Sequence, residues 1–257
     1  MNTYDYQRRA RRRLPRMVYD YVAGGADDEY GLKRNRDAYD ALTFAPRRFV
    51  DVAERSSQMS LWGKTYPAPI YVAPTGLNGV LWPNGDACLA RAAAEAGIPF
   101  ALSTASNMSI EEIAAVSNGE LWFQLYVLHR DIAKTMCERA QAAGYTTLIL
   151  TIDVLVNGNR ERDVRNGCSL PVKYNLRTMI DSALHPRWSL DLLRHGMPKL
   201  RNFETLKTVN LEAQAALMRR EMDASFDFEA LKWLRETWTG KLIVNGIARA
   251  EDVKRCG

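Results

Sequence analysis

The feature that most constrains the fold is a series of short, continuously apolar runs separated by helical segments. Five such runs follow one another, at residues 69–74, 99–103, 121–127, 146–153 and 241–244. Amphipathic or alanine-rich helical patterns lie between and after them, at 85–96, 109–116, 132–143 and 250–255. Strands that are apolar throughout, rather than alternately, are typical of a parallel sheet covered on both faces. The sequence therefore predicts an α/β protein built on a parallel sheet.

The positions of polar residues favour a TIM (β/α)8 barrel over a nucleotide-binding fold. Thr75 follows a predicted strand, and Ser103 and Asp153 are the last residues of two others, so all three lie at carboxyl ends of strands, which is where barrel active sites lie. No GxGxxG turn opens a helix after the first strand, and Gln58 stands where a P-loop ending at Thr65 would need glycine. Only five strands are found, so we expect an incomplete barrel, with about five of eight strands.

Composition excludes several other classes of protein. The 257 residues carry a net charge of +5 and are 47% hydrophobic, which is ordinary for a globular chain and not for a disordered one. No apolar run approaches the ~18 residues of a membrane span, and no apolar signal segment begins the chain. The four cysteines are dispersed without a CxxC pair and the three histidines without HExxH, so neither a disulfide framework nor a metal site is predicted.

The segment 172–207, which follows the fourth predicted strand, has an unusual composition. Seven Lys or Arg side chains oppose three acidic ones, for a net charge of +4, and Trp188, Leu192 and Leu193 are interspersed with them. Basic residues mixed with Trp and Leu suit the headgroup region of an anionic membrane, into which Trp188, Leu192 and Leu193 would insert their apolar side chains. A solvated surface excursion with a small core of its own fits the composition equally well. No RRM, KH or helix-turn-helix pattern supports binding of nucleic acid.

Several segments resemble a known family. They are 14–30 (LPRMVYDYVAGGADDEY), 73–79 (APTGLNG), 123–127 (FQLYV), 150–153 (LTID), 159–163 (NRERD), 185–193 (HPRWSLDLL), 194–200 (RHGMPKL) and 214–226 (QAALMRREMDASF). Together they resemble the FMN-dependent 2-hydroxy-acid oxidases and dehydrogenases, and the last three resemble the internal membrane segment, and the helix after it, of a membrane-associated, mandelate-oxidising branch. The resemblance implies an FMN-linked TIM barrel, of which residues 1–257 would form the N-terminal portion, with 172–207 as a membrane-surface insertion after strand four.

The resemblance also implies a reaction and the residues that bind its substrate. The expected reaction is oxidation of a 2-hydroxy acid, with mandelate converted to benzoylformate. Arg160 matches the arginine that clamps the substrate carboxylate, which a guanidinium can do bidentately. Tyr126 matches the tyrosine that bonds the substrate hydroxyl, and Tyr21 the one that meets the carboxylate. Asp153 matches the carboxylate that pairs with the catalytic histidine, and Gly76 leaves room for a phenyl ring.

FMN is the cofactor that the resemblance implies. The turn at Ala73, Pro74, Thr75 and Gly76 matches the backbone that lies against the flavin ring near N5. Three polar side chains match groups that bond the ring edge and ribityl chain: Ser103, Gln124 and Thr151. Asn245 stands where the family has a lysine near flavin N1 and O2. An asparagine can donate a hydrogen bond there, but it cannot supply the charge that stabilises reduced, anionic flavin.

The family's catalytic histidine lies in an SNHGGR motif after strand six, and this motif does not occur in the 257 residues. His129, His185 and His195 match other positions. We therefore expect the chain by itself to be inactive and to bind FMN poorly. Two alternatives remain: a different 2-hydroxy acid such as lactate or glycolate, and a non-catalytic remnant that only binds a membrane or a partner.

The implied partners follow from the same resemblance. Electrons would pass from the flavin to a quinone-type acceptor in the membrane, with the protein held peripherally on the cytoplasmic side of the inner membrane through residues 172–207. A complete protein of this kind would form a homo-oligomer.

Overall fold

The computed structural model describes residues 2–154, 158–167, 175–206 and 222–256. The chain divides into two compact units. Unit 1 comprises residues 1–57 and 157–194, and unit 2 comprises residues 58–156 and 195–257. The predicted strands all belong to unit 2, so the predicted site residues that follow strands are carried by that unit.

Unit 2 is built around a parallel sheet with the strand order β3-β4-β5-β6. These strands span Phe100–Ser103, Leu121–Tyr126, Thr147–Thr151 and Lys241–Asn245. Almost every side chain of β3, β4 and β5 is buried, as continuous apolar strands predict. On one face Ala101, Trp122 and Ile149 form a core cluster, against which Ile243 packs. The predicted parallel sheet is thus confirmed for the last four of the five runs.

The helices predicted at 85–96, 109–116, 132–143 and 250–255 all form in unit 2, with bounds within two residues of those predicted, together with three helical segments that the sequence did not predict. The helices of unit 2 are α4 (Asn78–Leu81), α5 (Gly85–Glu95), α6 (Ile110–Val116), α7 (Arg130–Ala142), α12 (Phe228–Thr237) and α13 (Ala250–Cys256), with a 3₁₀ helix η1 at Arg201–Leu206. Ser109 and Glu112 form a capping box at the start of α6, a signal that is visible in the sequence. Gly97 and Gly144 follow α5 and α7 with positive φ, which stops each helix and returns the chain to the sheet.

Unit 1 is helical in the part that the structure describes. Its helices are α1 (Thr3–Arg13), α2 (Arg16–Ala23), α3 (Tyr30–Asp40), α8 (Glu161–Arg165), α9 (Leu176–Ala183) and α10 (Pro186–His195). The two stretches of chain that form it are joined by side chains, because Arg13 Nη2 donates to Asp191 Oδ2 at 2.6 Å and the Arg16 amide donates to Asp181 Oδ2 at 2.6 Å. These bonds attach α9 and α10 to the N-terminal helices.

One prediction about the sheet is wrong, and one pair of strands was not predicted. The run 69–74 is not a regular strand, since only Val72 pairs with Phe100 in an isolated parallel bridge; the prolines at 69 and 74 cannot donate to a ladder. An antiparallel pair, β1 (Met59–Leu61) and β2 (Lys64–Tyr66), was not predicted. The described parallel strands do not close into a barrel, and they number four where we expected about five.

The segment 172–207 does not form one body. Residues 172–174 and 207 lie outside the described part; α9 and nearly all of α10 belong to unit 1, whereas Leu200 and Phe203 are buried in unit 2. Trp188, which we expected to insert into lipid, is buried at 6% exposure. The large apolar side chains that α9 and α10 do expose, with the leucine that follows α9, are Leu176, Met179, Ile180, Leu184, Leu190 and Leu193. Among the described helices, none is long and apolar enough to cross a bilayer.

Candidate functional site

The predicted flavin residues of unit 2 gather at the carboxyl ends of the parallel strands. Ser103 pairs in register with Gln124, and Thr151 pairs in register with both Tyr126 and Asn245. Strands in register end at one edge of a sheet, so residues far apart in the sequence become neighbours. We call Ser103, Gln124, Tyr126, Thr151 and Asn245 the strand-end cluster.

Gln124 carries a buried hydrogen-bond donor without a partner. Its Oε1 accepts from Ser103 Oγ and from the Thr104 amide, both at 3.2 Å. Because a backbone N–H can only donate, these bonds identify which end of the amide is the oxygen. The opposite atom, Nε2, is buried and has no hydrogen-bond partner in the described structure. A buried unpaired donor is costly in a protein interior, so this amide is suited to an acceptor on a bound molecule.

Gly76 is held against the cluster by close packing. A Cβ built on Gly76 would lie 3.1 Å from Ala105 Cβ and 3.8 Å from Ser103 Oγ. A methyl group would thus press on Ala105 rather than enter open space, which gives glycine a packing reason in addition to the predicted room for a substrate ring. The neighbouring Ala73 and Thr75 are exposed and Pro74 is partly buried.

A buried network that the sequence did not reveal fixes the turn containing Gly76. Asn78 Nδ2 donates to Thr75 Oγ1 at 2.7 Å and to Asp86 Oδ1 at 2.7 Å. Ser106 Oγ donates to Asp86 Oδ2 at 2.6 Å. Burial raises the pKa of the Asp86 carboxyl, while the bonds from Ser106 and Asn78 oppose that rise. Asp86 therefore ties the turn to the loop after β3.

The available signal for this network was weak. Asp86 stands in the first turn of α5, where acidic residues are common for helix-dipole reasons alone. Nothing in the sequence distinguishes it from the exposed acidic residues of other first turns, because its burial depends on tertiary packing.

Tyr126 lies between two other predicted site residues. Burial raises the pKa of its hydroxyl; a hydrogen bond with Ser103 opposes the rise and the Asp153 charge adds to it. The phenol therefore remains protonated at neutral pH and can donate. Asp153 packs on the loop after β6: a Cβ on Gly246, whose φ is +101°, would lie 2.7 Å from Asp153 Cγ. Glycine is required at 246 both for its φ and for this approach.

Asn245 is the exposed member of the strand-end cluster. Its Nδ2 donates to Thr151 Oγ1 at 3.4 Å, which is a long bond. The Asn245 side chain can therefore turn to bond a group outside the cluster, at the loss of only one weak hydrogen bond.

Tyr21 and Arg160 form a second cluster, in unit 1. Arg160 Nη2 donates to the Tyr21 carbonyl, its Nε donates to Asp163 Oδ2, and its guanidinium carbon lies 5.2 Å from the centre of the Tyr21 ring. Asp163 is buried, and its Oδ1 has no partner among the described residues. The sequence predicted Arg160 and Tyr21 but not Asp163, although its place three residues after Arg160 in a helical segment was a usable signal.

In the described part of the chain, no group of three or more His, Cys, Asp or Glu side chains is arranged to hold a metal ion. The predicted residues instead form two clusters, one in each unit, and both are rich in donors. Such clusters suit an electron-rich ring edge and a carboxylate.

Comparison with known proteins gives consistent matches. Residues 10–257 match the family of FMN-dependent dehydrogenases. The chain is 57% identical over 255 residues to (S)-mandelate dehydrogenase of Pseudomonas putida, covering 99% of this chain and 65% of that protein. It is 38% identical to a putative L-lactate dehydrogenase of Mycobacterium tuberculosis, covering 97% of this chain and 60% of that protein. The chain thus spans less than two thirds of the length of these curated relatives.

Solved structures agree. The crystal structure of the monotopic membrane protein (S)-mandelate dehydrogenase matches with a TM-score of 0.97, covering 99% of this chain and 68% of that one. A mandelate oxidase structure matches with a TM-score of 0.74 at 29% identity, covering 98% of this chain and 63% of that one.

Proposed function

The chain belongs to the family of FMN-dependent dehydrogenases, and on that basis we propose that it serves the oxidation of a 2-hydroxy acid, most specifically of (S)-mandelate to benzoylformate. The strand-end cluster would hold the flavin ring, and the Arg160–Tyr21 cluster would hold the substrate. The match to (S)-mandelate dehydrogenase at 57% identity supports mandelate over other 2-hydroxy acids.

The residues of unit 2 fit a flavin. The unpartnered Gln124 Nε2 can donate to a ring carbonyl. Ser103 and Thr151 offer hydroxyl groups in the same cluster. The close packing of Gly76 on Ala105 also places the backbone of the Gly76 turn next to Ser103. When bound, FMN accepts the two electrons and the α-hydrogen of the substrate.

The remaining residues would bind and orient the acid. Arg160 uses Nε and Nη2 within unit 1, and a substrate carboxylate would take the rest of its fork. Tyr126 would donate to the substrate hydroxyl, since its phenol stays protonated. Asp153 would stabilise a cationic partner that receives the hydroxyl proton.

The buried donor on Gln124 is the observation that carries the proposal, and it is testable by FMN titration. We expect weak quenching of flavin fluorescence, with a dissociation constant above the micromolar range, because the contacts identified here serve the ring and not the phosphate. Gln124→Leu should weaken binding about tenfold, the effect of roughly one lost hydrogen bond. Gln141→Leu is the matched control, because the amide of this half-buried glutamine near the end of α7 bonds Thr239 and not a residue of the strand-end cluster. Equal binding by both variants would refute the assignment of Gln124.

Turnover by the chain alone should be at background. His129, His185 and His195 match positions other than that of the family's base, and His185 Nδ1 also lies 2.7 Å from the Asp181 carbonyl, so none of the three is assigned as the base. A general base contributes ~10²–10⁴-fold. Dye reduction with (S)-mandelate at ~1 s⁻¹ or more would contradict this expectation.

Lactate is the second candidate substrate, favoured by relatives named L-lactate dehydrogenase at 37–39% identity. Binding of the products to the FMN-loaded chain discriminates the two. Benzoylformate should perturb the flavin spectrum at lower concentration than pyruvate does; the reverse order would favour lactate.

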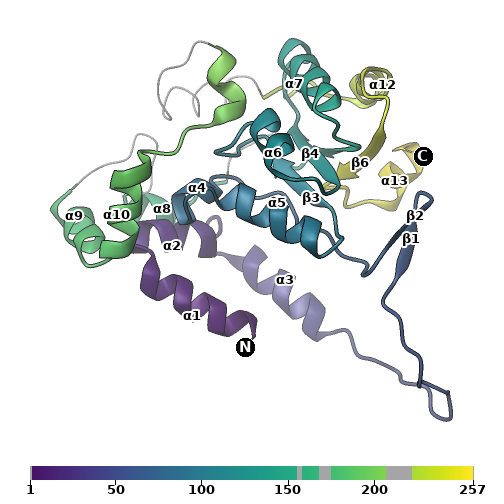
Figure 1. Cartoon of the computed structure of the whole chain (residues 1–257), viewed down its shortest axis with the longest axis horizontal. Coiled ribbons are helices and arrows are strands. Elements are labelled where there is room, and N and C mark those ends of the chain that lie inside the picture. Colours follow the sequence, from purple (N-terminus) through teal and green to yellow (C-terminus); the bar gives the residue numbers. More distant parts are fainter. Residues whose placement is uncertain (1, 155–157, 168–174, 207–221, 257) are drawn as a thin grey trace. The chain divides into compact units, whose positions relative to one another are not determined.

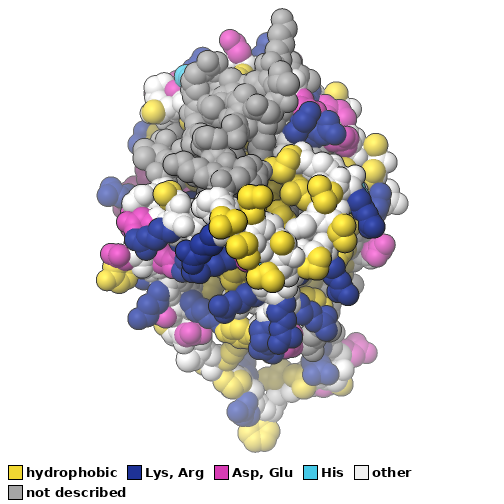
Figure 2. All heavy atoms as spheres, turned by 90° about the vertical axis from the view of Figure 1, so that its left-hand side faces the viewer, with side chains coloured by type: hydrophobic (Ala, Val, Ile, Leu, Met, Phe, Trp, Pro, Cys, Tyr) yellow, Lys and Arg dark blue, Asp and Glu magenta, His cyan; other side chains and the backbone are white. Residues whose placement is uncertain are grey.

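We further propose that α9 and α10 dock the protein on an anionic membrane. Figure 2, which faces the side where Figure 1 places these helices, shows hydrophobic side chains gathered next to Lys and Arg side chains. The exposed basic residues of the two helices are Arg177, Arg187 and Arg194. Each basic residue near such a surface contributes about 1 kcal/mol, and salt screens that contribution. A similar protein is described as a monotopic membrane protein.

Cosedimentation with phosphatidylglycerol vesicles tests the docking. Replacing Arg177, Arg187 and Arg194 with Gln should lower binding at low salt and flatten the salt dependence. Replacing Leu184 and Leu193 with Ser should weaken binding at every salt concentration. Lys199 is unsuitable for this test because it pairs with Glu204 at 3.4 Å. A wild-type chain that stays in the supernatant at low salt would refute the docking.

The proposal has three further parts. Electrons pass to a membrane quinone, the protein lies on the cytoplasmic side of the inner membrane, and the complete protein forms a homo-oligomer. Reduction of a soluble quinone analogue by the FMN-loaded chain, after its flavin has been reduced chemically with dithionite, would support the first of these.

A further inference from the structure

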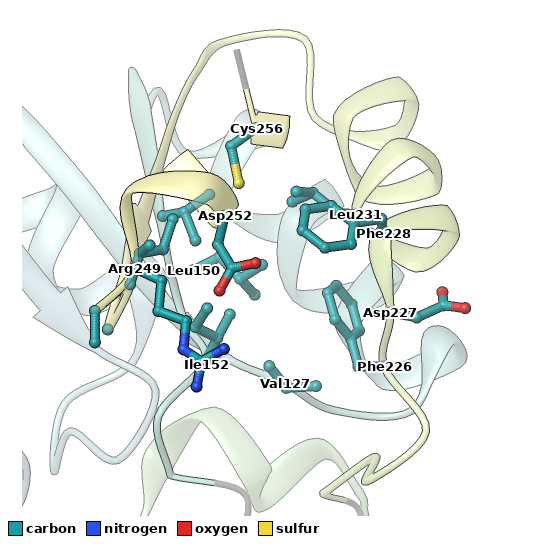
Figure 3. A pocket seen from close by; sticks show the side chains of 14 residues that line it. Val127, Leu150, Ile152, Phe226, Asp227, Phe228, Leu231, Arg249, Asp252 and Cys256 are labelled. Atoms are coloured by element: carbon teal, nitrogen blue, oxygen red, sulfur yellow. The ribbon is translucent and has the colours of Figure 1, made fainter. Parts of the chain in front are cut away.

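A cavity of about 400 Å³ in unit 2 is lined by residues other than those predicted to bind the flavin. Figure 3 shows Phe228 and Leu231 of α12 and Asp252 of α13 around it. None of the described residues that line this cavity belongs to the strand-end cluster. The place of a flavin ring therefore follows from the hydrogen-bond donors of that cluster, above all from the direction in which Gln124 Nε2 points.

The chain that follows α10 reaches the strand-end cluster through one buried side chain. Residues 199–203, which we name the anchor segment, belong to unit 2 and follow the end of α10 at His195. Leu200 and Phe203 are buried, and Asn202 between them is only 1% exposed. A buried amide is costly unless its polar atoms are paired, so the partners of Asn202 show what the anchor segment holds.

The side-chain amide of Asn202 bonds the loop after β3 with one end and the start of α6 with the other. Its Nδ2 donates to the Ser103 carbonyl at 3.4 Å and to the Thr104 carbonyl at 3.3 Å, both long bonds. Its Oδ1 accepts from the Ile110 amide at 3.0 Å. That amide opens α6 and has no carbonyl partner within the helix. Because a backbone N–H can only donate, this bond identifies which end of the Asn202 amide is the oxygen.

The peptide group between Ser103 and Thr104 is held from both sides. Its carbonyl accepts from Asn202 Nδ2, whereas its N–H donates to Gln124 Oε1 at 3.2 Å and to the Gln124 carbonyl at 3.0 Å. A peptide group is planar, so fixing its carbonyl also fixes the direction of its N–H. Asn202 thus orients the donor that holds Gln124 Oε1, and with it the direction of the buried, unpartnered Nε2.

Two further bonds hold the anchor segment in place. Arg139 Nη1 donates to the Asn202 carbonyl at 3.0 Å. Asn107 Nδ2 donates to the Lys199 carbonyl at 2.9 Å, and its Oδ1 accepts from the Gly79 amide at 2.9 Å, close after the predicted flavin turn. The anchor segment is therefore bonded to the loop after β3 and, through Asn107, to the chain that leaves the flavin turn.

We propose that Asn202 is a positioning residue of the flavin site, which acts through the peptide group between Ser103 and Thr104 to direct the Gln124 Nε2 donor toward the flavin ring. This inference rests on the proposed function, because it takes the ring as the acceptor of that donor. It also gives the segment 172–207 a second role. The helices α9 and α10 would dock the protein, and the residues that follow them shape the cofactor site.

Asn202→Asp tests this role in the chain without a cofactor. The substitution keeps the shape of the side chain and an acceptor for the Ile110 amide, but a carboxylate cannot donate to the two carbonyls. Burial raises the pKa of the introduced carboxyl, so acidification restores a donor. In NMR spectra the Nε2 hydrogens of Gln124 should shift at about pH 8 and return toward their wild-type positions at about pH 5.5.

Asn118→Asp, in the exposed turn before β4, is the matched control. It introduces the same charge, and the Gln124 resonances should stay as in wild type at both pH values. Unchanged Gln124 resonances in Asn202→Asp, or a shift that acidification does not reverse, would overturn the proposal. If Asn202→Asp does not fold at the higher pH, Asn107→Asp removes only the donor to the Lys199 carbonyl. It should shift the same resonances by a smaller amount, and the absence of a shift would overturn the proposal.

Titration with riboflavin connects the direction of Gln124 to the ring. Riboflavin has the ring and the ribityl chain without the phosphate, so its charge is constant over this pH range. Asn202→Asp should bind it about three- to tenfold more weakly than wild type at the higher pH, and equally at the lower. A variant that carries both Gln124→Leu and Asn202→Asp should bind as Gln124→Leu does. Additive losses would mean that Asn202 does not act through Gln124.

The two measurements separate this inference from the proposed function. Riboflavin binding by wild type together with unchanged Gln124 resonances in Asn202→Asp overturns the role of Asn202 and leaves the flavin site standing. Absence of riboflavin binding by wild type counts against the proposed function. A reversible shift of the Gln124 resonances would then still show that Asn202 directs this donor.

Discussion

The two clusters of predicted site residues are held in place by different kinds of interaction. The strand-end cluster of unit 2 stands on buried parallel strands, whose backbone ladders fix the register of Ser103, Gln124 and Thr151. Arg160 and Tyr21 of unit 1 are separated by 139 positions and meet through side-chain bonds of a half-exposed arginine.

This difference predicts how each cluster responds to the loss of a single side chain. A backbone ladder survives the loss of any one side chain, because its bonds do not involve side chains. A side-chain contact between distant segments disappears with either partner. We therefore expect the strand-end cluster to keep its arrangement when a neighbouring side chain is replaced, whereas the Arg160–Tyr21 cluster should lose it. The exception would be the buried Asp86 network, if the strand-end cluster also depends on it.

Asp86→Ala tests that exception and has the largest expected effect. The substitution leaves the Ser106 hydroxyl and one of the two Asn78 Nδ2 hydrogens without an acceptor in the protein interior. We expect this to lower the free energy of unfolding by about 3 kcal/mol. Urea denaturation measures this. Glu138→Ala on the exposed face of α7 is the control and should change stability by less than about 0.5 kcal/mol. Equal effects would show that the network does not support the turn at Gly76.

Asp163→Ala should likewise lower the free energy of unfolding, by removing a buried acceptor in unit 1. It removes the buried acceptor of Arg160 Nε and should cost about 1–2 kcal/mol. The Nε–H resonance of Arg160 should broaden and move toward its free position, while the amides of β4 and β5 keep their hydrogen-exchange protection. Loss of protection in those strands would mean that the two clusters are coupled.

Glu111 and Arg139 provide a side-chain contact within unit 2 for comparison. Arg139 donates to both carboxylate oxygens, at 2.7 and 2.8 Å, and lowers the pKa of Glu111 from 4.5 to about 2. A lowered pKa in the folded state stabilises the protein above the unfolded pKa, and this stabilisation is lost as the pH falls from about 4.5 to 2.

Because Glu111 is half-exposed, the pair contributes only about 0.5–1 kcal/mol. Glu111→Gln should destabilise by this amount at neutral pH, and wild type and variant should converge in urea denaturation below the folded pKa. A difference that persists at the acid limit would mean that the charge is not its cause.

Asn245→Lys has the smallest expected effect on stability. Asn245 is exposed and makes one long bond, so the free energy of unfolding should change by less than about 0.5 kcal/mol. Binding of reduced FMN should nevertheless tighten more than binding of oxidised FMN if position 245 faces the flavin, since the ammonium adds positive charge near the anionic reduced ring. Unchanged affinity would remove Asn245 from the predicted site.

Much of unit 2 was predictable because its signals are local. Continuous apolar runs, the Ser109–Glu112 capping box and the glycines after α5 and α7 each act within a few residues, and the corresponding elements formed. Tyr21 and Arg160 were found by resemblance and do lie together. Asp86, Asn78 and Asp163 were missed because their burial arises only when distant segments pack. Trp188 was misplaced because amphipathic spacing does not reveal which face of a helix finds a protein partner.

The burial of Trp188 bears on how α10 would meet a lipid surface. Many amphipathic peptides are coils in water and become helical on the bilayer, so that part of the interaction free energy is consumed in ordering the chain. Here α10 is already a helix whose Trp188 is buried in the protein. Bonds from Arg13 to Asp191 and from the Arg16 amide to Asp181 attach α10 and α9 to the N-terminal helices. Adsorption would therefore require no coil-to-helix transition. Adding vesicles should leave the helical circular dichroism unchanged, and the association rate should depend on electrostatic encounter rather than on folding.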